Sequence, residues 1–180
     1  MHGYDFRNAP GWGSGGASEY KDVLGAARYL QARPEFKTKS LGIYGLSWGG
    51  YLTEQALARN SDVFKAGFDM AGVFDFVGDG FKNSPAAYLD GWRSPVYLAQ
   101  GDDDRNADFN QGMMLAQSVR TERPQVELVE RVIPNETHEL ALKFEDMVSV
   151  YGGGSDFLLT RLNSSPAGSD KGDPVRVLSR

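Results

Sequence analysis

The sequence predicts an α/β fold in which a mostly parallel sheet carries helices on both faces. Short β-prone runs alternate along the chain with longer stretches of helical periodicity, which is typical of parallel strands joined by crossover helices. The chain has 180 residues, enough for one domain with a hydrophobic core and too few for two. Because ligands in such folds bind beyond the carboxyl ends of the strands, we expect the functional residues in the loops found there.

Five short runs are predicted as strands from their aliphatic, aromatic and β-branched residues. They are residues 4–7, 41–44, 66–71, 96–100 and 126–132. Residues 17–33 are predicted as a helix because apolar side chains recur there at helical spacing and Pro34 follows the end. The apolar face of this helix consists of Tyr20, Val23, Leu24, Ala27 and Leu30. Further helices are predicted at residues 47–59, 109–120, 140–150 and 157–162.

The composition, 41% hydrophobic and 24% charged, is that of an ordinary globular protein. A net charge of −5 offers no basic surface for a phosphate backbone, so we expect no nucleic-acid partner. No apolar run reaches the length of about 18 residues that a membrane span requires. The chain has no cysteine and its two histidines lie far apart in sequence, so we expect no disulfide, metal site or cofactor. A homo-oligomer remains open, as do cytoplasmic and exported locations, because a targeting signal of a longer parent would lie upstream.

A compositional change near residue 164 divides the chain. From there the sequence is rich in serine, glycine, proline and charged residues, and it cannot bury enough apolar surface to order itself. We therefore expect a single domain over residues 1–163 and a disordered polar tail over residues 164–180.

The segment Gly45-Leu46-Ser47-Trp48-Gly49-Gly50 has the pattern of a nucleophile elbow. Glycine two residues before and two residues after the serine removes side chains that would clash in the tight strand-to-helix turn. The pattern can also arise by chance in a chain with 22 glycines. The apolar strand before it and the helix after it favour the functional interpretation, with Ser47 as nucleophile and the Trp48 amide as oxyanion donor.

A serine nucleophile needs a base, and the chain offers only His2 and His138. His138 follows the last predicted strand and is the candidate base. His2 stands at the extreme terminus. Its dipeptide with Gly3 could imitate an oxyanion loop, but the run that follows suits a later strand better.

The base in turn needs a carboxylate that holds its tautomer and stabilises its positive charge. Asp102, Asp103 and Asp104 follow the predicted strand 96–100 and a glycine turn, at the expected end of the sheet. A solvated acidic turn is the alternative role for these residues. Periodicity does not choose among the three.

These residues together resemble the catalytic domain of the prolyl oligopeptidase family, which includes dipeptidyl peptidases and acylaminoacyl peptidases. The resemblance runs from about residue 5 to residue 162. Its motifs are Asp5-Phe6-Arg7 with the glycine-rich Pro10-Gly11-Trp12-Gly13, the elbow ending at Tyr51, Ser94-Pro95 before a strand that ends Gly101-Asp102-Asp103-Asp104-Arg105-Asn106, and Pro134-Asn135-Glu136-Thr137-His138.

The resemblance implies an α/β-hydrolase fold, a catalytic triad and a peptide substrate. The family's Gly-x-x-Asp-x-x-Val turn places the triad carboxylate at Asp104, and its Pro-x-Glu-x-His loop supports His138. Two positions depart from the family pattern: Gln100 stands where histidine is usual and Ala107 where valine is usual. We expect neither to affect proton transfer.

The resemblance also bears on substrate binding and completeness. Residues 75–94 would line the specificity pocket and are short for the family. Val73 and Phe76 are candidate pocket residues, although ordinary packing explains them equally well. In the family several strands and a second oxyanion donor precede the position of Asp5, so we expect the sheet to lack its first strands and the chain alone to react poorly.

The leading hypothesis is a serine peptidase that cleaves oligopeptides through an acyl-enzyme formed on Ser47. Two alternatives remain open, a carboxylesterase on the same fold and a non-catalytic fragment of a hydrolase.

Overall fold

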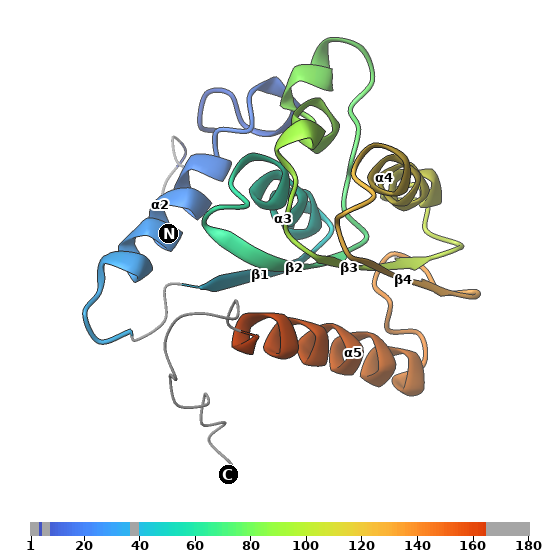
Figure 1. Ribbon diagram of the computed structural model, residues 1–180. Helices are drawn as coiled ribbons and strands as arrows, with labels where there is room; N and C mark the ends of the chain where they lie inside the picture. The colour runs from blue at the N-terminus through green and yellow to red at the C-terminus, as the bar shows by residue number, and fades with distance from the viewer. Residues whose placement is uncertain (1–3, 5–7, 37–39, 165–180) are drawn as a thin grey trace.

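A four-stranded parallel sheet forms the centre of the protein, with helices on both of its faces (Figure 1). The computed structural model describes residue 4, residues 8–36 and residues 40–164. The strands are β1 (Leu41–Leu46), β2 (Phe64–Met70), β3 (Val96–Gly101) and β4 (Leu128–Ile133), and they pair in the order β1-β2-β3-β4. Every neighbouring pair is parallel. The α/β fold class expected from the sequence is therefore confirmed.

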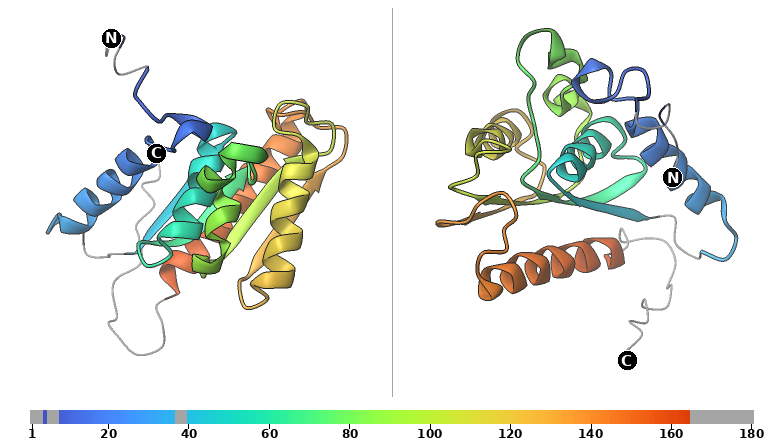
Figure 2. Two further views of the ribbon diagram at one scale, coloured as in Figure 1. Left: turned by 90° about the horizontal axis from the view of Figure 1, so that it is seen from above. Right: turned by 180° about the vertical axis from the view of Figure 1, so that it is seen from behind.

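The helices form two layers of unequal size. Figure 2 shows α2, α3 and α4 on one side of the sheet and α5 alone on the other. The long helices are α2 (Tyr20–Ala32), α3 (Trp48–Arg59), α4 (Phe109–Glu122) and α5 (Phe144–Asn163). Three short 3-10 helices complete the described chain: η1 (Gly13–Gly15), η2 (Gly78–Asn83) and η3 (Pro85–Gly91).

Three of the expected elements differ from those observed. The strand expected over residues 4–7 falls mostly outside the described residues, and Tyr4 itself is helical. The two closing helices expected at 140–150 and 157–162 are one helix, α5, which begins only at Phe144. Its central glycines let it approach the sheet, because a Cβ on Gly154 would stand 2.3 Å from the Phe68 ring. The polar tail expected from residue 164 lies, after Ser164 itself, outside the described residues.

Two hydrophobic clusters hold the layers together, one on each face of the sheet. On the α2, α3 and α4 side, the fully buried members of the cluster include Leu57, Trp92, Leu98 and Leu115. On the α5 side, Phe68, Met70 and Tyr97 pack against Val150 and Phe157. Each large apolar side chain buried in this way contributes roughly 1.5–3 kcal/mol. Both faces of β2 and β3 are therefore buried, which keeps these strands rigid.

All four strands point the same way, so the loops that follow them share one edge of the sheet. This arrangement brings segments from residues 47, 71, 102 and 134 onward to the same side of the molecule. None of the helices in the described ranges combines the length and the apolar character needed to cross a bilayer.

Candidate active site

Ser47 occupies the sharp turn between β1 and α3. Its backbone has φ 60° and ψ −115°, a conformation that is strained for a residue other than glycine. Such a conformation costs roughly 1–3 kcal/mol and persists only where the surroundings enforce it. The Ser47 amide donates a 2.8 Å hydrogen bond to the Met70 carbonyl at the end of β2. The turn is therefore fixed to the neighbouring strand.

Close backbone packing explains the glycines of this turn. A Cβ on Gly45 would lie 2.3 Å from the Gly49 carbonyl carbon, so the strand and the helix approach too closely for any side chain there. A Cβ on Gly50 would lie 2.4 Å from the Asp69 carboxylate. A Cβ on Gly49 would meet no neighbour. Gly49 matters here because its backbone is the part of α3 that a side chain on Gly45 would strike. The local geometry is that of a nucleophile elbow.

Asp104 and His138 form a hydrogen-bonded pair in the loops after β3 and β4. His138 Nδ1 lies 2.8 Å from Asp104 Oδ2, with the Asp104 side chain fully buried and that of His138 12% exposed. Asp104 Oδ1 accepts hydrogen bonds from the amides of Asn106 and Ala107, at 2.9 and 3.1 Å. These bonds stabilise a carboxylate and fix its orientation toward the imidazole.

The other two aspartates of the acidic turn have different partners. Asp102 accepts a 2.6 Å hydrogen bond from the Asn135 amide, which ties the two loops together. Asp103 forms a surface ion pair with Arg105 at 3.1 Å. Of the three, Asp104 is the aspartate that the structure brings to His138.

Gln100 belongs to the same cluster. Its side-chain amide donates to Asp104 Oδ2 at 2.9 Å and to the Ala107 carbonyl at 3.2 Å. In the sequence, this residue stands out only as a departure from the prolyl oligopeptidase pattern. The signal that could have found its role is a polar residue at the next-to-last position of a buried strand, just before the glycine that opens the acidic turn.

Glu136 holds the loop that carries His138. Its fully buried carboxylate accepts hydrogen bonds from the Leu142 and Lys143 amides at 3.1 and 3.0 Å. Its carbonyl accepts a bond from the Asp103 amide, and a Cβ on Gly101 would stand 2.2 Å from that carbonyl oxygen. The glutamate of the Pro-x-Glu-x-His loop therefore fixes the histidine loop to the acidic turn.

Ser47 and the Asp104–His138 pair share the carboxyl edge of the sheet and follow different strands. In the described part of the chain, the Ser47 hydroxyl makes no hydrogen bond with His138. His2, the other histidine considered, lies outside the described residues. A hollow of about 310 Å³ beside His138 is lined by Asp103, Arg105, Asn106, Thr137, His138 and Glu139.

Trp12, Trp48, Tyr51 and Phe76 form an aromatic cluster, and Trp48 is the residue that follows Ser47 in sequence. Trp48 is its centre, with ring centroids 5.2 Å from Trp12, 4.7 Å from Tyr51 and 6.2 Å from Phe76. The Trp48 indole donates a 2.9 Å hydrogen bond to Glu19, which also accepts the Gly13 amide. Glu19 therefore anchors the glycine-rich loop to the residue whose main-chain amide is the expected oxyanion donor.

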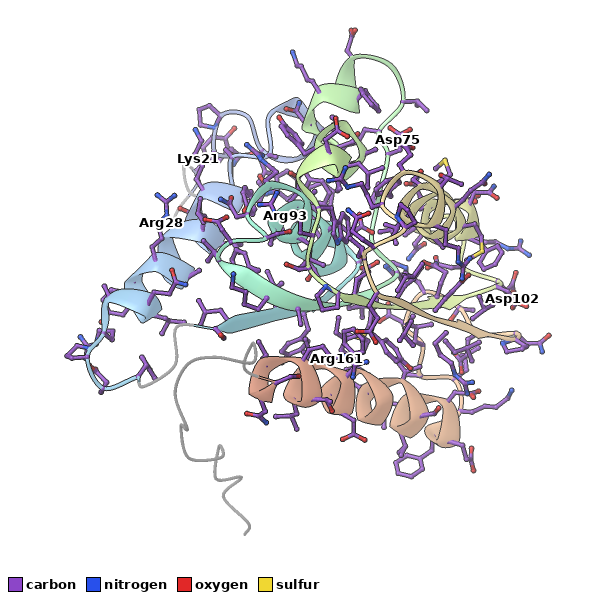
Figure 3. The ribbon with its side chains drawn as sticks, viewed as in Figure 1. Lys21, Arg28, Asp75, Arg93, Asp102 and Arg161 are labelled. Carbon is purple, nitrogen blue, oxygen red and sulfur yellow. The ribbon has the colours of Figure 1, made fainter. Side chains whose placement is uncertain are left out.

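The loop after β2 carries both candidate pocket residues. Phe76 is part of the aromatic cluster, 5.3 Å from Tyr51, and Val73 lies half-buried in the same loop. Gln111 of α4 clamps this loop by accepting from the Asp75 amide and donating to the Asp75 carbonyl. Figure 3 shows Asp75 above the sheet beside α4, on the side opposite Arg161 of α5.

No set of three histidine and carboxylate side chains in the described residues could hold a metal ion.

Known proteins match this chain in sequence and in structure. The model of the prolyl oligopeptidase family matches residues 1–83. The inactive dipeptidyl peptidase 10 of Rattus norvegicus and that of Mus musculus are each 35% identical over 60 residues, which is 33% of this chain and 8% of each relative. The chain thus spans a small part of the curated relatives it matches.

The structural matches cover most of this chain and under a third of each neighbour. The Pyrococcus horikoshii acylaminoacyl peptidase has a TM-score of 0.71 at 21% identity, with 86% of this chain and 29% of that one covered. An acylaminoacyl peptidase in complex with Z-Gly-Gly-Phe-chloromethyl ketone has a TM-score of 0.69 at 21% identity, covering 84% and 28%. The Porphyromonas gingivalis dipeptidyl peptidase 4 has a TM-score of 0.64 at 20% identity, covering 79% and 22%. Residues 1–83 are thus similar to the prolyl oligopeptidase family, and the parallel sheet of the chain has the α/β-hydrolase fold.

Proposed function

We propose that the chain carries the catalytic residues of a serine peptidase that hydrolyses peptide bonds of oligopeptides through an acyl-enzyme. Ser47 is the nucleophile, His138 the base, and Asp104 the carboxylate that orients His138. The observation that carries the proposal is the 2.8 Å contact between Asp104 and His138 Nδ1, at the same edge of the sheet as a serine in a strained elbow.

The hydrogen bond to Asp104 determines which histidine nitrogen can act as the base. With Nδ1–H donating to Asp104, the lone pair of Nε2 is free to take the proton of the Ser47 hydroxyl. The serine oxygen then bonds to the substrate carbonyl carbon, and the tetrahedral intermediate collapses as the imidazolium gives its proton to the leaving amine. Water repeats these steps on the acyl-enzyme, which releases the acid and restores Ser47.

The Trp48 amide is the proposed oxyanion donor. Trp48 is the first residue of α3, and the backbone amides at a helix amino terminus favour negative charge. The hydrogen bond from its indole to Glu19 restrains the residue from the other side. One such donor typically contributes about 100- to 1000-fold in rate.

Val73, Phe76 and the aromatic cluster support a substrate with an apolar side chain beside the scissile bond. The rings of Trp48 and Phe76 lie next to the nucleophile turn and present aromatic surface. An acylaminoacyl peptidase of the same fold binds Z-Gly-Gly-Phe-chloromethyl ketone, a peptide analogue that ends in phenylalanine. The same compound is therefore a suitable probe for this chain.

The proposal is tested with two reagents of different specificity. A fluorophosphonate should modify Ser47, and Z-Gly-Gly-Phe-chloromethyl ketone should alkylate His138, both located by peptide mass mapping. Ser47→Ala should lose the fluorophosphonate label, and Ser155→Ala, a change on the exposed side of α5, should keep it. Modification at another serine would overturn the assignment. Turnover of paired amide and ester substrates then separates a peptidase from a carboxylesterase.

A second candidate is a non-catalytic member of the family. It is favoured by the names of the curated relatives, which are inactive dipeptidyl peptidases. This candidate predicts that neither reagent modifies the chain, or a longer protein that contains it, although the Asp104–His138 contact is present.

A further inference from the structure

Two carboxylic acids lie side by side behind the nucleophile elbow. Glu54 comes from α3 and Asp69 from β2, and their relative exposures are 1% and 0%. A Cβ on Gly72 would stand 2.6 Å from Asp69 Oδ1 and 2.7 Å from Glu54 Oε1. Because Asp69 Oδ1 and Glu54 Oε1 are both this close to the same position, the two carboxyl groups are neighbours.

The four carboxyl oxygens have no hydrogen-bond donor among the described residues. The Gly72 amide faces Asp69 and favours its charged form, without reaching hydrogen-bond geometry. Two adjacent buried carboxylates without a cation would repel each other in a medium that solvates neither. A proton on one acid removes a charge and supplies the missing donor, because a protonated carboxyl donates to a carboxylate.

The electrostatic surroundings agree with this reading. Burial raises the pKa of Asp69 to about 7, and burial together with the nearby Asp69 raises the pKa of Glu54 well above its ordinary value. Tyr44 of β1 and Tyr97 of β3 contact Phe68, on the opposite face of the sheet. Titratable groups that other elements bring to the near side include Tyr20 of α2, Tyr51 and Arg59 of α3, Asp75 of the following loop, and Tyr88 and Asp90 of η3. None of them shifts the pKa of either acid.

The pair stands between the two segments that enforce the conformation of Ser47. Gly50, in the first turn of α3, meets Asp69 Oδ1, and its Cβ would also lie 2.8 Å from the Met70 carbonyl oxygen. That carbonyl accepts the Ser47 amide. The next residue, Ala71, has φ 48° and donates to the Ala99 carbonyl of β3. A change in the charge of the pair therefore acts directly on the support of the elbow.

We propose that Glu54 and Asp69 hold at least one shared proton at neutral pH and act as a positioning pair that keeps the end of β2 against α3 and so maintains the Ser47 turn. The link to catalysis, though not the pair itself, rests on the function proposed above. Because both acids are more basic in the folded chain than in the unfolded one, the stability they contribute is complete below the ordinary carboxyl range. It declines as the pH rises through about 7 and on toward the loss of the Glu54 proton.

The test measures protonation and elbow structure separately, between about pH 5 and about pH 9. Carbon-13 NMR of labelled side-chain carboxyls reports the ionisation of the two acids. Hydrogen exchange of the Ser47 and Ala71 amides, corrected for the intrinsic rate, reports the elbow, with the Leu115 amide of α4 as reference. In the native protein we expect at least one acid to be protonated at neutral pH. Elbow protection should fall as the pH rises, by up to about tenfold per pH unit for each proton that the folded pair still holds, and should level off once those protons are lost.

Isosteric variants distinguish positioning from general packing. Glu54→Gln keeps a donor to Asp69 but cannot lose it, so elbow protection should stay constant with pH. Glu122→Gln, at the exposed end of α4, should follow the native profile. Two ionised carboxyls at neutral pH would overturn the pair, and a titrating pair with unchanged elbow protection would overturn its positioning role. Both readouts are available in the native chain if Glu54→Gln fails to fold, and neither depends on Ser47 chemistry. A failure of fluorophosphonate labelling alone would count against the proposed function only.

Discussion

Asp104→Asn should abolish most of the reactivity of Ser47 while leaving the fold in place. Asp104 Oδ1 accepts two backbone amides, and Oδ2 accepts Gln100 Nε2 and faces His138 Nδ1. An asparagine amide group would therefore meet donors in either orientation. Directed at the Oδ2 position, it donates to His138 Nδ1 and forces the ring proton onto Nε2, the nitrogen that must accept the serine proton.

The magnitude follows from the loss of the working tautomer. In enzymes of this mechanism the change costs about 10⁴ in rate, which corresponds to about 5.5 kcal/mol in activation free energy. The cost in stability is smaller, about 1–3 kcal/mol, because the buried Gln100 donor loses its acceptor. The Oδ1 side keeps its two backbone donors only if the amide nitrogen points away from them.

The assay compares second-order rate constants of fluorophosphonate labelling, with thermal unfolding as a check on folding. Asp103→Asn is the matched control, because Asp103 lies next in sequence and forms only an exposed ion pair with Arg105, of small net value. Its labelling rate should stay within about tenfold of the native value. Greater damage from Asp103→Asn than from Asp104→Asn, or labelling of Asp104→Asn at the native rate, would refute the role of Asp104.

Two further predictions concern the triad and the packing of α5. Ser47→Ala and His138→Ala should each remove measurable turnover in a longer active protein, and the double variant should be no worse, because the residues act as a unit; additive losses would contradict this. Gly154→Ala should destabilise the fold by about 1–3 kcal/mol in urea unfolding, since its Cβ would overlap the Phe68 ring. Gly152 lies in the same helix, and a Cβ there would meet no neighbour, so Gly152→Ala should stabilise the fold by about 0.5–1 kcal/mol. Equal effects at the two glycines would show that the contact with Phe68 is unimportant.

The elbow was predictable from sequence because its signals are local. Ser47 lies between an apolar run and a helical pattern, with a glycine two residues before it and another two residues after it. All of these features can be recognised in the sequence alone. The strands β1 to β4 were found for the same reason, with ends that differ by at most two residues. The break expected inside α5 was wrong because glycine lowers helix propensity, while in the structure Gly153 and Gly154 allow contact with Tyr97 and Phe68.

The polar residues that support the site were not predictable in this way. Glu19 acts through Trp48, which is distant in sequence, and Gln100 acts through Asp104, which lies on the other side of a turn. Neither residue belongs to a periodic pattern. The choice of Asp104 over its two neighbours needed either a family pattern or the geometry of the loop. Glu54 and Asp69 lie in α3 and β2, and charged residues there would ordinarily be assigned to the surface.

The two buried aspartates of this fold show how donors determine the role of a carboxyl group. Asp104 meets two backbone amides, the Gln100 amide and the His138 ring, so hydrogen bonds stabilise its carboxylate beside the histidine that must become cationic. Asp69 lies under the neighbouring strand end and meets no such donor among the described residues, only the carboxyl of Glu54. For Glu54 and Asp69, the available donor is therefore the O–H of a protonated carboxyl group. A charged acid therefore serves the proposed chemistry, while a protonated pair supports the backbone turn from which the chemistry would start.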